Sequence, residues 1–241
     1  MHQQPELNAQ VRSTTFAAIL AGLTLLAALG PSPARAQVAV AAKAGTLGAG
    51  VELHVRLLSQ LNLRAGLNRY SYSDRRKESD IEYDAEARLR NETLLLDWFP
   101  LSGGFHLTAG ALRNDNEANG KSLSPPSGFY NLGGVPVPAS QVGTLRAKVD
   151  FDQNVPYAGL GWGNPVREGR RLSFYFDAGV VFQGKPHVRL AADIPPGSPL
   201  NDPVARQALE ILLRAEARDI EDDLEKYDQY PVVSLGLAYR F

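Results

Sequence analysis

The sequence contains no cysteine. Without thiols the protein cannot form a disulfide framework, a cysteine-ligated zinc site, an iron–sulfur cluster or a thiol nucleophile. It also lacks an excess of charge of either sign, because 25 basic and 26 acidic residues leave a formal net charge of -1. Domains that bind nucleic acid usually carry a basic patch, so this balance argues against a nucleic-acid partner.

The apolar run from Phe16 to Leu29 is shorter than the roughly 20 residues that a membrane-spanning helix needs. It follows Arg12 and precedes Ala34-Arg35-Ala36, which fits the small-x-small pattern of a signal-peptide cleavage site. A membrane anchor is the alternative for this run. We expect residues 1–36 to be a cleaved signal peptide and the exported mature chain, residues 37–241, to form one domain.

The strongest positive signal is strict alternation of apolar and polar residues. From Leu47 to Leu57 the odd positions are apolar, whereas Glu52, His54 and Arg56 lie between them. A period of two residues predicts a strand with one apolar and one polar face. The pattern recurs and predicts seven strands, over about 46–57, 61–72, 81–98, 105–114, 144–162, 172–190 and 230–241.

Two of these strands change phase along their length. Residues 94–98 are apolar at even positions after an apolar run at odd positions, and the same change follows Phe151. A β-bulge inserts one residue and shifts the phase in this way. We expect one bulge near Asn91 and another at Pro156, because proline in a sheet is confined to edges, strand starts and bulges.

Alternating strands occur in soluble sandwiches as well as in membrane barrels. Here the polar face carries both charge signs in near balance, together with glycines, so we expect it to line a barrel lumen filled with ion pairs. The predicted lumen charge network comprises Glu52, His54, Arg56, Arg64, Glu82, Asp84, Glu86, Arg88, Arg90, Arg146, Lys148, Asp150, Asp177 and Arg240. Asp97, Asp152, Lys185 and Arg189 fall on the same predicted face.

The aromatic residues are expected to form belts at both interfaces of the membrane. Beside short connections lie Trp98, Phe99, Phe105, Trp162, Phe174, Tyr239 and Phe241; near long connections lie Tyr70, Tyr72, Tyr83, Phe151, Phe182, Tyr227 and Tyr230. The short connections are residues 58–60, 100–104 and 164–170, and the long ones are 73–80, 115–143 and 186–229. This difference is typical of periplasmic turns and extracellular loops.

The strand count must be even in a bacterial single-chain barrel, so one strand is missing from the seven. It is either the segment from Val38 to Lys43 or a strand around residues 131–140. The prediction is an all-β fold, a transmembrane antiparallel up-and-down β-barrel of about eight strands, with ten possible.

One helix is predicted in the last long loop, near residues 203–225. Asp202 is a suitable N-cap and Pro203 a suitable first helical residue. An apolar face expected to rest on the barrel mouth is formed by Val204, Ala208, Ile211, Leu212 and Ala215. An acidic cluster is formed by Glu221, Asp222, Asp223 and Glu225. It either binds a divalent cation, bridging to lipopolysaccharide, or is an ordinary solvated helix face.

The chain ends in SLGLAYRF, with Tyr239 and Phe241 in its last three positions. AYRF resembles the C-terminal signal that outer-membrane barrels present to the barrel-assembly machinery. The stretches GTLGAGVEL, LNLRAGLNRYSYS, DWFPLSGGFHLTAGALRNDN, VPYAGLGWGNP, SFYFDAGVVFQGKP and YPVVSLGLAYRF resemble an uncharacterised proteobacterial outer-membrane β-barrel family, distantly similar to the outer membrane protein W type. The resemblance implies the bacterial outer membrane, with its lipid, lipopolysaccharide and the assembly machinery as partners.

Function is less constrained. The resemblance implies a narrow conduit or binding pocket for small solutes, hydrophobic ones among them. The alternative is a structural or surface-interaction barrel with a plugged lumen. A lipid-modifying enzyme is less favoured, because His54, His106 and His187 lie in no His-x-Ser pattern and no nucleophile elbow. We therefore predict no catalytic residue, cofactor or metal.

Overall fold

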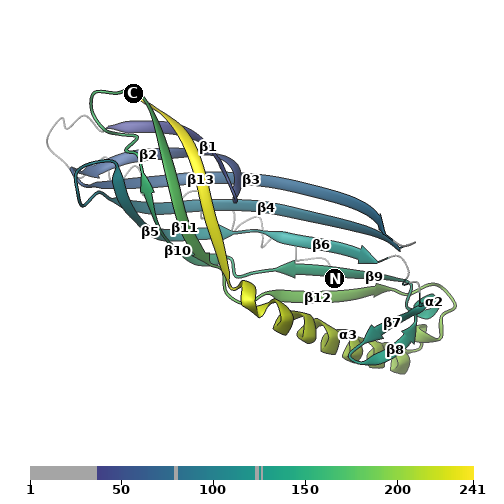
Figure 1. The fold of residues 1–241 in the computed structure, drawn as a ribbon. Coiled ribbons are helices and arrows are strands. Elements are labelled where there is room, and N and C mark those ends of the chain that lie inside the picture. Colours follow the sequence, from purple (N-terminus) through teal and green to yellow (C-terminus); the bar gives the residue numbers. More distant parts are fainter. Residues whose placement is uncertain (1–36, 79–80, 123–124, 126) are drawn as a thin grey trace, which may run out of the picture. The chain divides into compact units, whose positions relative to one another are not determined.

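The computed structural model describes residues 37–78, 81–122, 125 and 127–241, and the side chains of residues 74–85 lie outside this description. The predicted signal peptide also lies outside the described residues. Eight antiparallel strands close into a ring in the order β1-β2-β3-β4-β5-β10-β11-β13 (Figure 1). Their bounds are β1 Val38–Gly45, β2 Gly48–Leu58, β3 Leu61–Glu78, β4 Ile81–Trp98, β5 Phe105–Asn114, β10 Asn154–Trp162, β11 Leu172–Phe182 and β13 Gln229–Arg240.

The predicted barrel of eight strands is confirmed. The missing strand is β1, which pairs with β13 from Ala39↔Arg240 to Gly45↔Ser234 and so closes the ring. The alternative segment forms a separate hairpin, β7 (Phe129–Leu132) and β8 (Val135–Pro138). Closure leaves no strand edge of the ring unpaired, as a barrel in lipid requires, because an unsatisfied backbone group there costs several kcal/mol.

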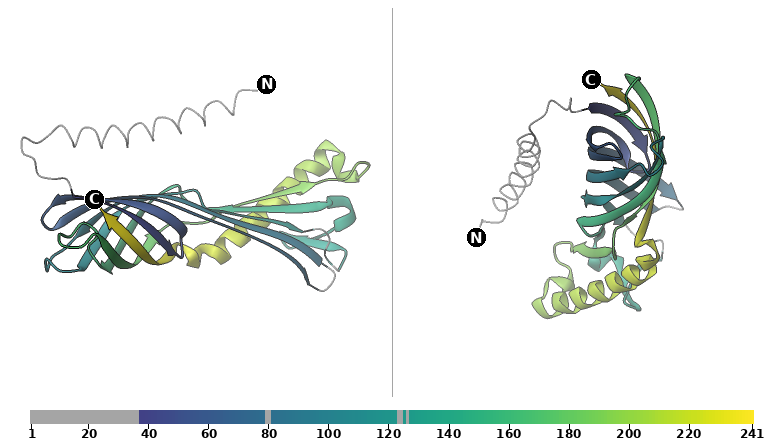
Figure 2. Two further views of the ribbon diagram at one scale, coloured as in Figure 1. Left: turned by 90° about the horizontal axis from the view of Figure 1, so that it is seen from above. Right: turned by 90° about the vertical axis from the view of Figure 1, so that its left-hand side faces the viewer.

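β3 and β4 continue well past the ring, and three further strands join them. β6 (Glu117–Ser122), β9 (Thr144–Asp150) and β12 (His187–Asp193) follow β4 in the order β4-β6-β9-β12 (Figures 1 and 2). We call these strands, together with residues 70–78 of β3 and 81–89 of β4, the extension. Its inner face continues the face that lines the barrel interior, and its outer face continues the face that surrounds the barrel.

Neither predicted bulge exists. β4 pairs with β3 without a register shift from Leu61↔Trp98 to Glu78↔Ile81, and β10 pairs smoothly with β5 through Pro156↔Ala111. The predicted strand 144–162 is instead divided into β9 and β10, and strand 172–190 into β11 and β12. A register shift does occur between β2 and β3, at Arg56/Leu58.

The phase of the apolar–polar alternation changes because the strands have their apolar environment outside the barrel but on the inner face of the extension. On the barrel, the residues that alternate outward, such as Leu94 and Leu96, are exposed, whereas Leu95 is buried inside. On the extension, Leu145 and Leu190 share the inner face and pack in a cluster with helix residue Leu213. A strand that continues from the barrel into the extension therefore keeps its register. Its apolar side chains point outward on the barrel and inward on the extension.

Helix α3 (Pro203–Leu224) confirms the predicted loop helix and packs beside β12 (Figure 1). The Asp202 side chain accepts hydrogen bonds from the backbone N–H groups of Val204 (2.9 Å) and Ala205 (3.2 Å), which caps the helix. Short elements flank it: α2 (Ala139–Val142), η1 (Pro199–Asn201) and η2 (Glu225–Tyr227).

The predicted apolar face of α3 is correct only in part: Leu212 is half-buried against the cluster that contains Leu209 and Leu213. Val204 is 76% exposed and Ile211 59% exposed. The buried stripe is Leu209, Leu213 and Ala217, because the helix packs against β12 and the β7–β8 hairpin rather than on the barrel mouth. Among the described residues, no helix is both long enough and apolar enough to cross a bilayer.

The outer face of the barrel is apolar and exposed. Aliphatic and aromatic side chains at the outward positions include Val40, Val51, Leu67, Leu94, Leu96, Leu107, Leu160, Phe176, Val233, Leu235 and Leu237. At the end that carries the C-terminus, Trp98, Trp162, Phe174, Tyr239 and Phe241 are all exposed, as one predicted aromatic belt requires.

Several predicted lipid contacts are wrong. Phe99 is 1% exposed and packs on His106, with ring centroids 5.0 Å apart. Leu47 turns into the barrel interior. In the second belt, Tyr70 and Tyr72 share the inward face of Asn68, because β3 keeps its register as it enters the extension. Tyr230 packs inward against the buried cluster that contains Leu47.

Candidate functional site

Arg64 on β3 is the centre of a charged layer inside the barrel. Its guanidinium is 2.6 Å from Asp177 on β11 (Nη1 to Oδ2) and 2.8 Å from Asp97 on β4 (Nη2 to Oδ1). Nη1 also lies 3.6 Å from Oε2 of Glu52 on β2. All four side chains are almost fully buried. One planar cation therefore joins four strands across the lumen, which suits the fork geometry of arginine.

Each carboxylate in this layer has a further partner. Glu52 accepts from Lys43 Nζ (2.7 Å, to Oε1) and from the Tyr175 hydroxyl (2.6 Å, to Oε2). The hydroxyl of Thr108 donates to Asp97 (2.8 Å), and His106 Nε2 lies 2.9 Å from Asp177 Oδ1. The lining strands thus give each buried carboxylate the Arg64 cation and at least one further polar partner, and such pairing is the condition for retaining charges in a low-dielectric interior.

Glycine at position 236 makes room for the Tyr175 ring. A Cβ built on Gly236 would overlap the ring carbon Cζ of Tyr175. Because real Cβ atoms do not approach so closely, a larger residue would displace the ring and its hydrogen bond to Glu52. The small residues on the inward face of β13 therefore follow from packing in the lumen.

An apolar layer lies next to the charged one and fills the barrel toward the extension. It consists of Leu47, Leu95, Leu112, Val155, Tyr157, Val181 and Val232. The space left between the two layers is about 10 Å³ and is lined by Lys43, Arg64, Thr93 and Ser234 among others. A cavity of that size holds about one water molecule. The side chains of the two layers therefore leave little space at this level.

A row of amides follows the apolar layer. Asn68, Asn91 and Asn114 lie directly opposite one another on β3, β4 and β5, and each is nearly fully buried. Asn91 Nδ2 donates to the Asn116 side chain (3.0 Å). Several amide atoms in the row, like both ring nitrogens of His54, have no hydrogen-bond partner among the described residues.

The predicted lumen residues divide into three groups, two of them in the barrel and one in the extension. Glu52, Arg64 and Asp177 meet in the charged layer, and His54 lies beside them with its ring edge-on to Tyr175. Arg56 and Arg240 lie at the end that carries the C-terminus and do not join the layer. Arg56 Nη1 donates to Gln37 (2.7 Å), and Arg240 Nε donates to the Arg170 carbonyl (3.2 Å).

The remaining residues of the predicted network belong to the extension, not to the lumen. Pairing there occurs on the outer face: Arg88 with Glu86 (2.8 Å), Lys148 with Glu117 (2.6 Å), Arg146 with Asp193, and Asp150 with Arg189. The prediction was wrong because it assumed two bulges and assigned the polar face of every strand to the lumen. Arg90 is also outward and exposed. The side chains of Glu82 and Asp84 lie outside the described residues.

The outer-face pairs are solvated and affect titration locally. The hydrogen bond from Lys148 holds the pKa of Glu117 below its ordinary value. In the loop after β11, the hydrogen bond to Glu225 raises the pKa of Lys185, and the two side chains are 2.7 Å apart.

Two members of the acidic cluster near the end of α3, Glu221 and Glu225, bind other parts of the chain. Glu221 Oε1 accepts from the backbone N–H of Val188 on β12 (2.7 Å), and Glu225 pairs with Lys185. No group of three or more histidines and carboxylates suited to a metal ion occurs in the part of the chain that the structure describes. These contacts connect the C-terminal end of α3 to β12 and to the loop that precedes it.

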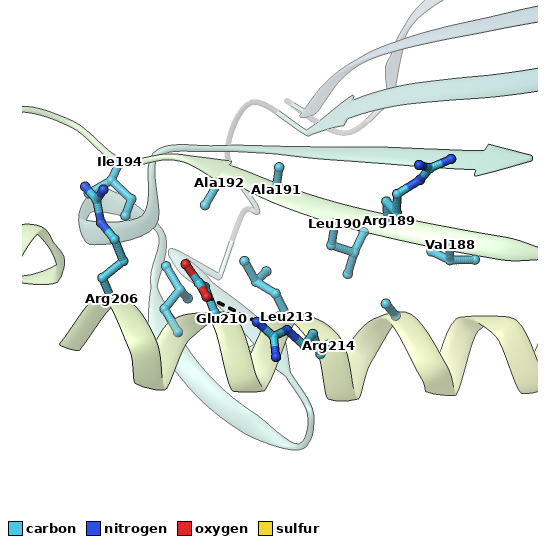
Figure 3. Close-up of a pocket in the computed structure, with 12 residues that line it drawn as sticks. Val188, Arg189, Leu190, Ala191, Ala192, Ile194, Arg206, Glu210, Leu213 and Arg214 are labelled. Atoms are coloured by element: carbon cyan, nitrogen blue, oxygen red, sulfur yellow. Dashed lines mark hydrogen bonds and ion pairs between the residues drawn. The ribbon is translucent and has the colours of Figure 1, made fainter. Parts of the chain in front are cut away.

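A groove runs between α3 and β12, with a volume of about 520 Å³ (Figure 3). Leu190, Leu209 and Leu213 form part of its floor. Arg206 and Arg214 lie along its helical wall, and Arg214 Nη2 is 3.3 Å from Glu210 Oε2. No pattern in the sequence indicates this groove, because it depends on where the helix packs.

Lys43 is the main member of the charged layer that the sequence analysis missed. It follows Val38–Ala42, a run of alanine and valine in which the two faces of β1 cannot be distinguished by polarity. The partners of Lys43 come from the register Lys43↔Gly50 and from Glu52 two residues further along β2.

No protein-family model and no curated protein sequence matches the chain. The structure is similar to the crystal structure of Acinetobacter baumannii CarO2, with a TM-score of 0.54 and 20% identity over 86% of this chain and 99% of that chain. For Acinetobacter baumannii CarO the TM-score is 0.52 and the identity 21%, over 85% and 98%. A major outer membrane protein from Thermus thermophilus has a TM-score of 0.41 and 17% identity, over 86% and 100%.

The similarity to the two Acinetobacter structures establishes the fold. A closed ring of eight antiparallel strands with an apolar exterior is the architecture of bacterial outer-membrane barrels. The protein therefore has the fold of a bacterial outer-membrane β-barrel.

Replacing Arg64 with methionine should lower the free energy of unfolding by about 3–5 kcal/mol, because three buried carboxylates lose their shared cation. Urea unfolding in detergent micelles measures the change. The matched control is Arg146→Met, whose exposed partner is Asp193; its loss should stay within about 1 kcal/mol. Equal effects of the two substitutions would show that the charged layer does not stabilise the barrel.

Proposed function

We propose that the protein is a closed barrel whose role is to hold the extension at the cell surface as an interaction platform. The observation that carries this proposal is the double closure of the lumen. The charged layer around Arg64 and the apolar layer around Leu112 leave a space of about 10 Å³ between them. We infer that these side chains block the passage of ions and solutes.

The extension supports the same proposal. It joins β6, β9 and β12 to the long strands β3 and β4, and α3 packs beside β12 with Leu209 and Leu213 buried. Charged side chains on its outer face form ion pairs. A large, internally packed element of this kind exceeds what is needed to connect barrel strands, where short loops suffice.

We assign this surface to the cell exterior. Outer-membrane barrels have short turns on the periplasmic side and long loops outside. The connections after β2, β4 and β10 are short and lie at the end of the C-terminus, whereas the extension lies at the other end. The expected partners are then outer-membrane lipid and lipopolysaccharide. The relation to the outer membrane protein W type is likewise a proposal, supported by the sequence stretches given above.

The second candidate is the narrow conduit or binding pocket for small solutes. The groove of about 520 Å³ between α3 and β12 favours it, since ligand pockets commonly have volumes of this order and combine an apolar floor with a few polar groups. This groove would bind a solute on the extension. Passage through the barrel would additionally require the Arg64 layer to rearrange.

A catalytic role has the least support. His106 is held between Asp177 and the Gly104 carbonyl, and His187 is exposed beside Asp152. No serine or threonine hydroxyl is hydrogen-bonded to either ring among the described residues. The arrangement of nucleophile, base and orienting group that acyl transfer requires is therefore not present there.

The refolded wild-type protein should give no discrete current steps in a planar lipid bilayer at either voltage polarity, because the two lumen layers block ion passage. Uptake of small sugars into vesicles that contain the protein should equal uptake into empty vesicles. Discrete, reproducible current steps would contradict the closed barrel and favour the conduit.

We propose that the barrel-assembly machinery recognises the C-terminal residue, Phe241. The Phe241 side chain is exposed and packs edge-on against Tyr239, with ring centroids 5.4 Å apart, while its backbone N–H donates to Val38 (3.1 Å). Deleting Phe241 should reduce the amount of folded protein in the outer membrane, measured by fractionation and heat modifiability. Phe241→Trp retains the aromatic end and should assemble normally; normal assembly of the deletion variant would refute this role.

A further inference from the structure

Two arginines face each other on the outer surface of the barrel, just past its apolar band. Arg69 on β3 lies directly opposite Arg90 on β4 in the strand register. Both side chains are exposed and point outward, as does Leu67 two residues before Arg69. Like charges placed directly opposite each other destabilise a sheet. Their placement therefore calls for a neutralising anion.

The protein does not supply that anion in the part of the chain that the structure describes. Several other outer-face bases have a carboxylate partner: Arg88 with Glu86, Arg113 with Asp115, and Lys148 with Glu117. No described carboxylate lies within ion-pair distance of Arg69 or Arg90. Glu92 shares their face but lies opposite Leu67 and Arg113 in the register, and it forms no ion pair with either arginine.

The position of the pair along the barrel indicates the source of the anion. From Leu61 to Arg69 the strand rises by about 26 Å, or about 20 Å along the barrel axis once a typical strand tilt is included. The apolar band of a membrane barrel is about 25 Å tall. Leu61 lies opposite Trp98 at one edge of this band, so Arg69 and Arg90 lie near the other edge, where lipid headgroups begin.

We propose that Arg69 and Arg90 together bind a phosphate group of a phosphorylated lipid in the leaflet that surrounds the barrel. A phosphate oxygen can accept charge-assisted hydrogen bonds from two guanidinium groups, which replaces their mutual repulsion with attraction. The acyl chains of the same lipid would lie against Leu67 and Leu94 below it. This inference goes beyond the platform role and does not depend on whether the lumen is closed.

The test measures binding of bis-phosphorylated lipid A to the refolded full mature chain in a non-ionic detergent, by native mass spectrometry. The Arg69→Gln/Arg90→Gln variant should bind lipid A about tenfold more weakly than the wild type, because it loses two charge-assisted contacts. The matched control is Arg146→Gln/Arg189→Gln, which removes two outer-face charges from β9 and β12. Its affinity should change by less than about twofold.

Stability separates lost binding from misfolding. Without phosphate or lipid A, Arg69→Gln/Arg90→Gln should unfold at a urea concentration equal to or above that of the wild type, because the repulsion is gone. Addition of lipid A should raise the urea concentration at which the protein unfolds more for the wild type than for the variant. The single substitution Arg90→Gln should be intermediate if the double variant folds poorly.

Three results would overturn the proposal. The first is unchanged lipid A affinity in the folded double variant. The second is an equal loss in the control variant, which would show only a general charge effect. The third is competition by inorganic phosphate as effective as that by lipid A at equal concentration, which would indicate a site for free anions rather than for lipid. A lumen that conducts ions would affect the platform proposal alone.

Discussion

The buried guanidinium of Arg64 is the interaction on which the barrel interior depends. It binds Asp177 and Asp97 closely and lies near Glu52, so strands from distant parts of the ring share one cation. Charges removed from water remain stable only when they are paired and hydrogen-bonded, and Lys43, Thr108, Tyr175 and His106 provide the further contacts. The glycine at position 236 follows from packing around this layer, because the Tyr175 ring that binds Glu52 occupies the space of a Cβ there.

The second constraint is lipid. Backbone groups inside a bilayer must be paired within the protein, so the eight strands close and β1 meets β13. Lipid also requires the barrel to be apolar outside, whereas the extension must be apolar inside, where α3 and the β7–β8 hairpin pack. The continuous strands β3 and β4 meet both requirements by exchanging their apolar face at the membrane boundary. At that same boundary Arg69 and Arg90 end the apolar band.

Period-two alternation, together with the need for an even strand number, was sufficient to predict a barrel of about eight strands, with ten left possible. The loop helix was predicted from its N-cap Asp202, from Pro203 and from helical spacing. The alternation also placed Glu52, Arg64 and Asp177 on the lumen face. It failed where the apolar surroundings changed sides: the phase change in β4 was interpreted as a bulge, and so Arg88, Arg146 and Lys148 were assigned to the lumen. Lys43 was missed because the alanines and valines before it on β1 show no polar contrast. The buried stripe of α3 depends on tertiary packing, which helical spacing alone does not determine.

The central claim is that Arg64 and Asp177 are coupled across a closed lumen. A double-mutant cycle tests it most directly, with Arg64→Met, Asp177→Asn and the combined variant unfolded by urea in the same micelles. The pair accounts for part of the effect of each substitution, so the combined variant should be less destabilised than the sum of the single variants by about 2 kcal/mol. Additivity to within about 0.5 kcal/mol would contradict the claim, since it would mean that the two residues do not interact in the folded barrel.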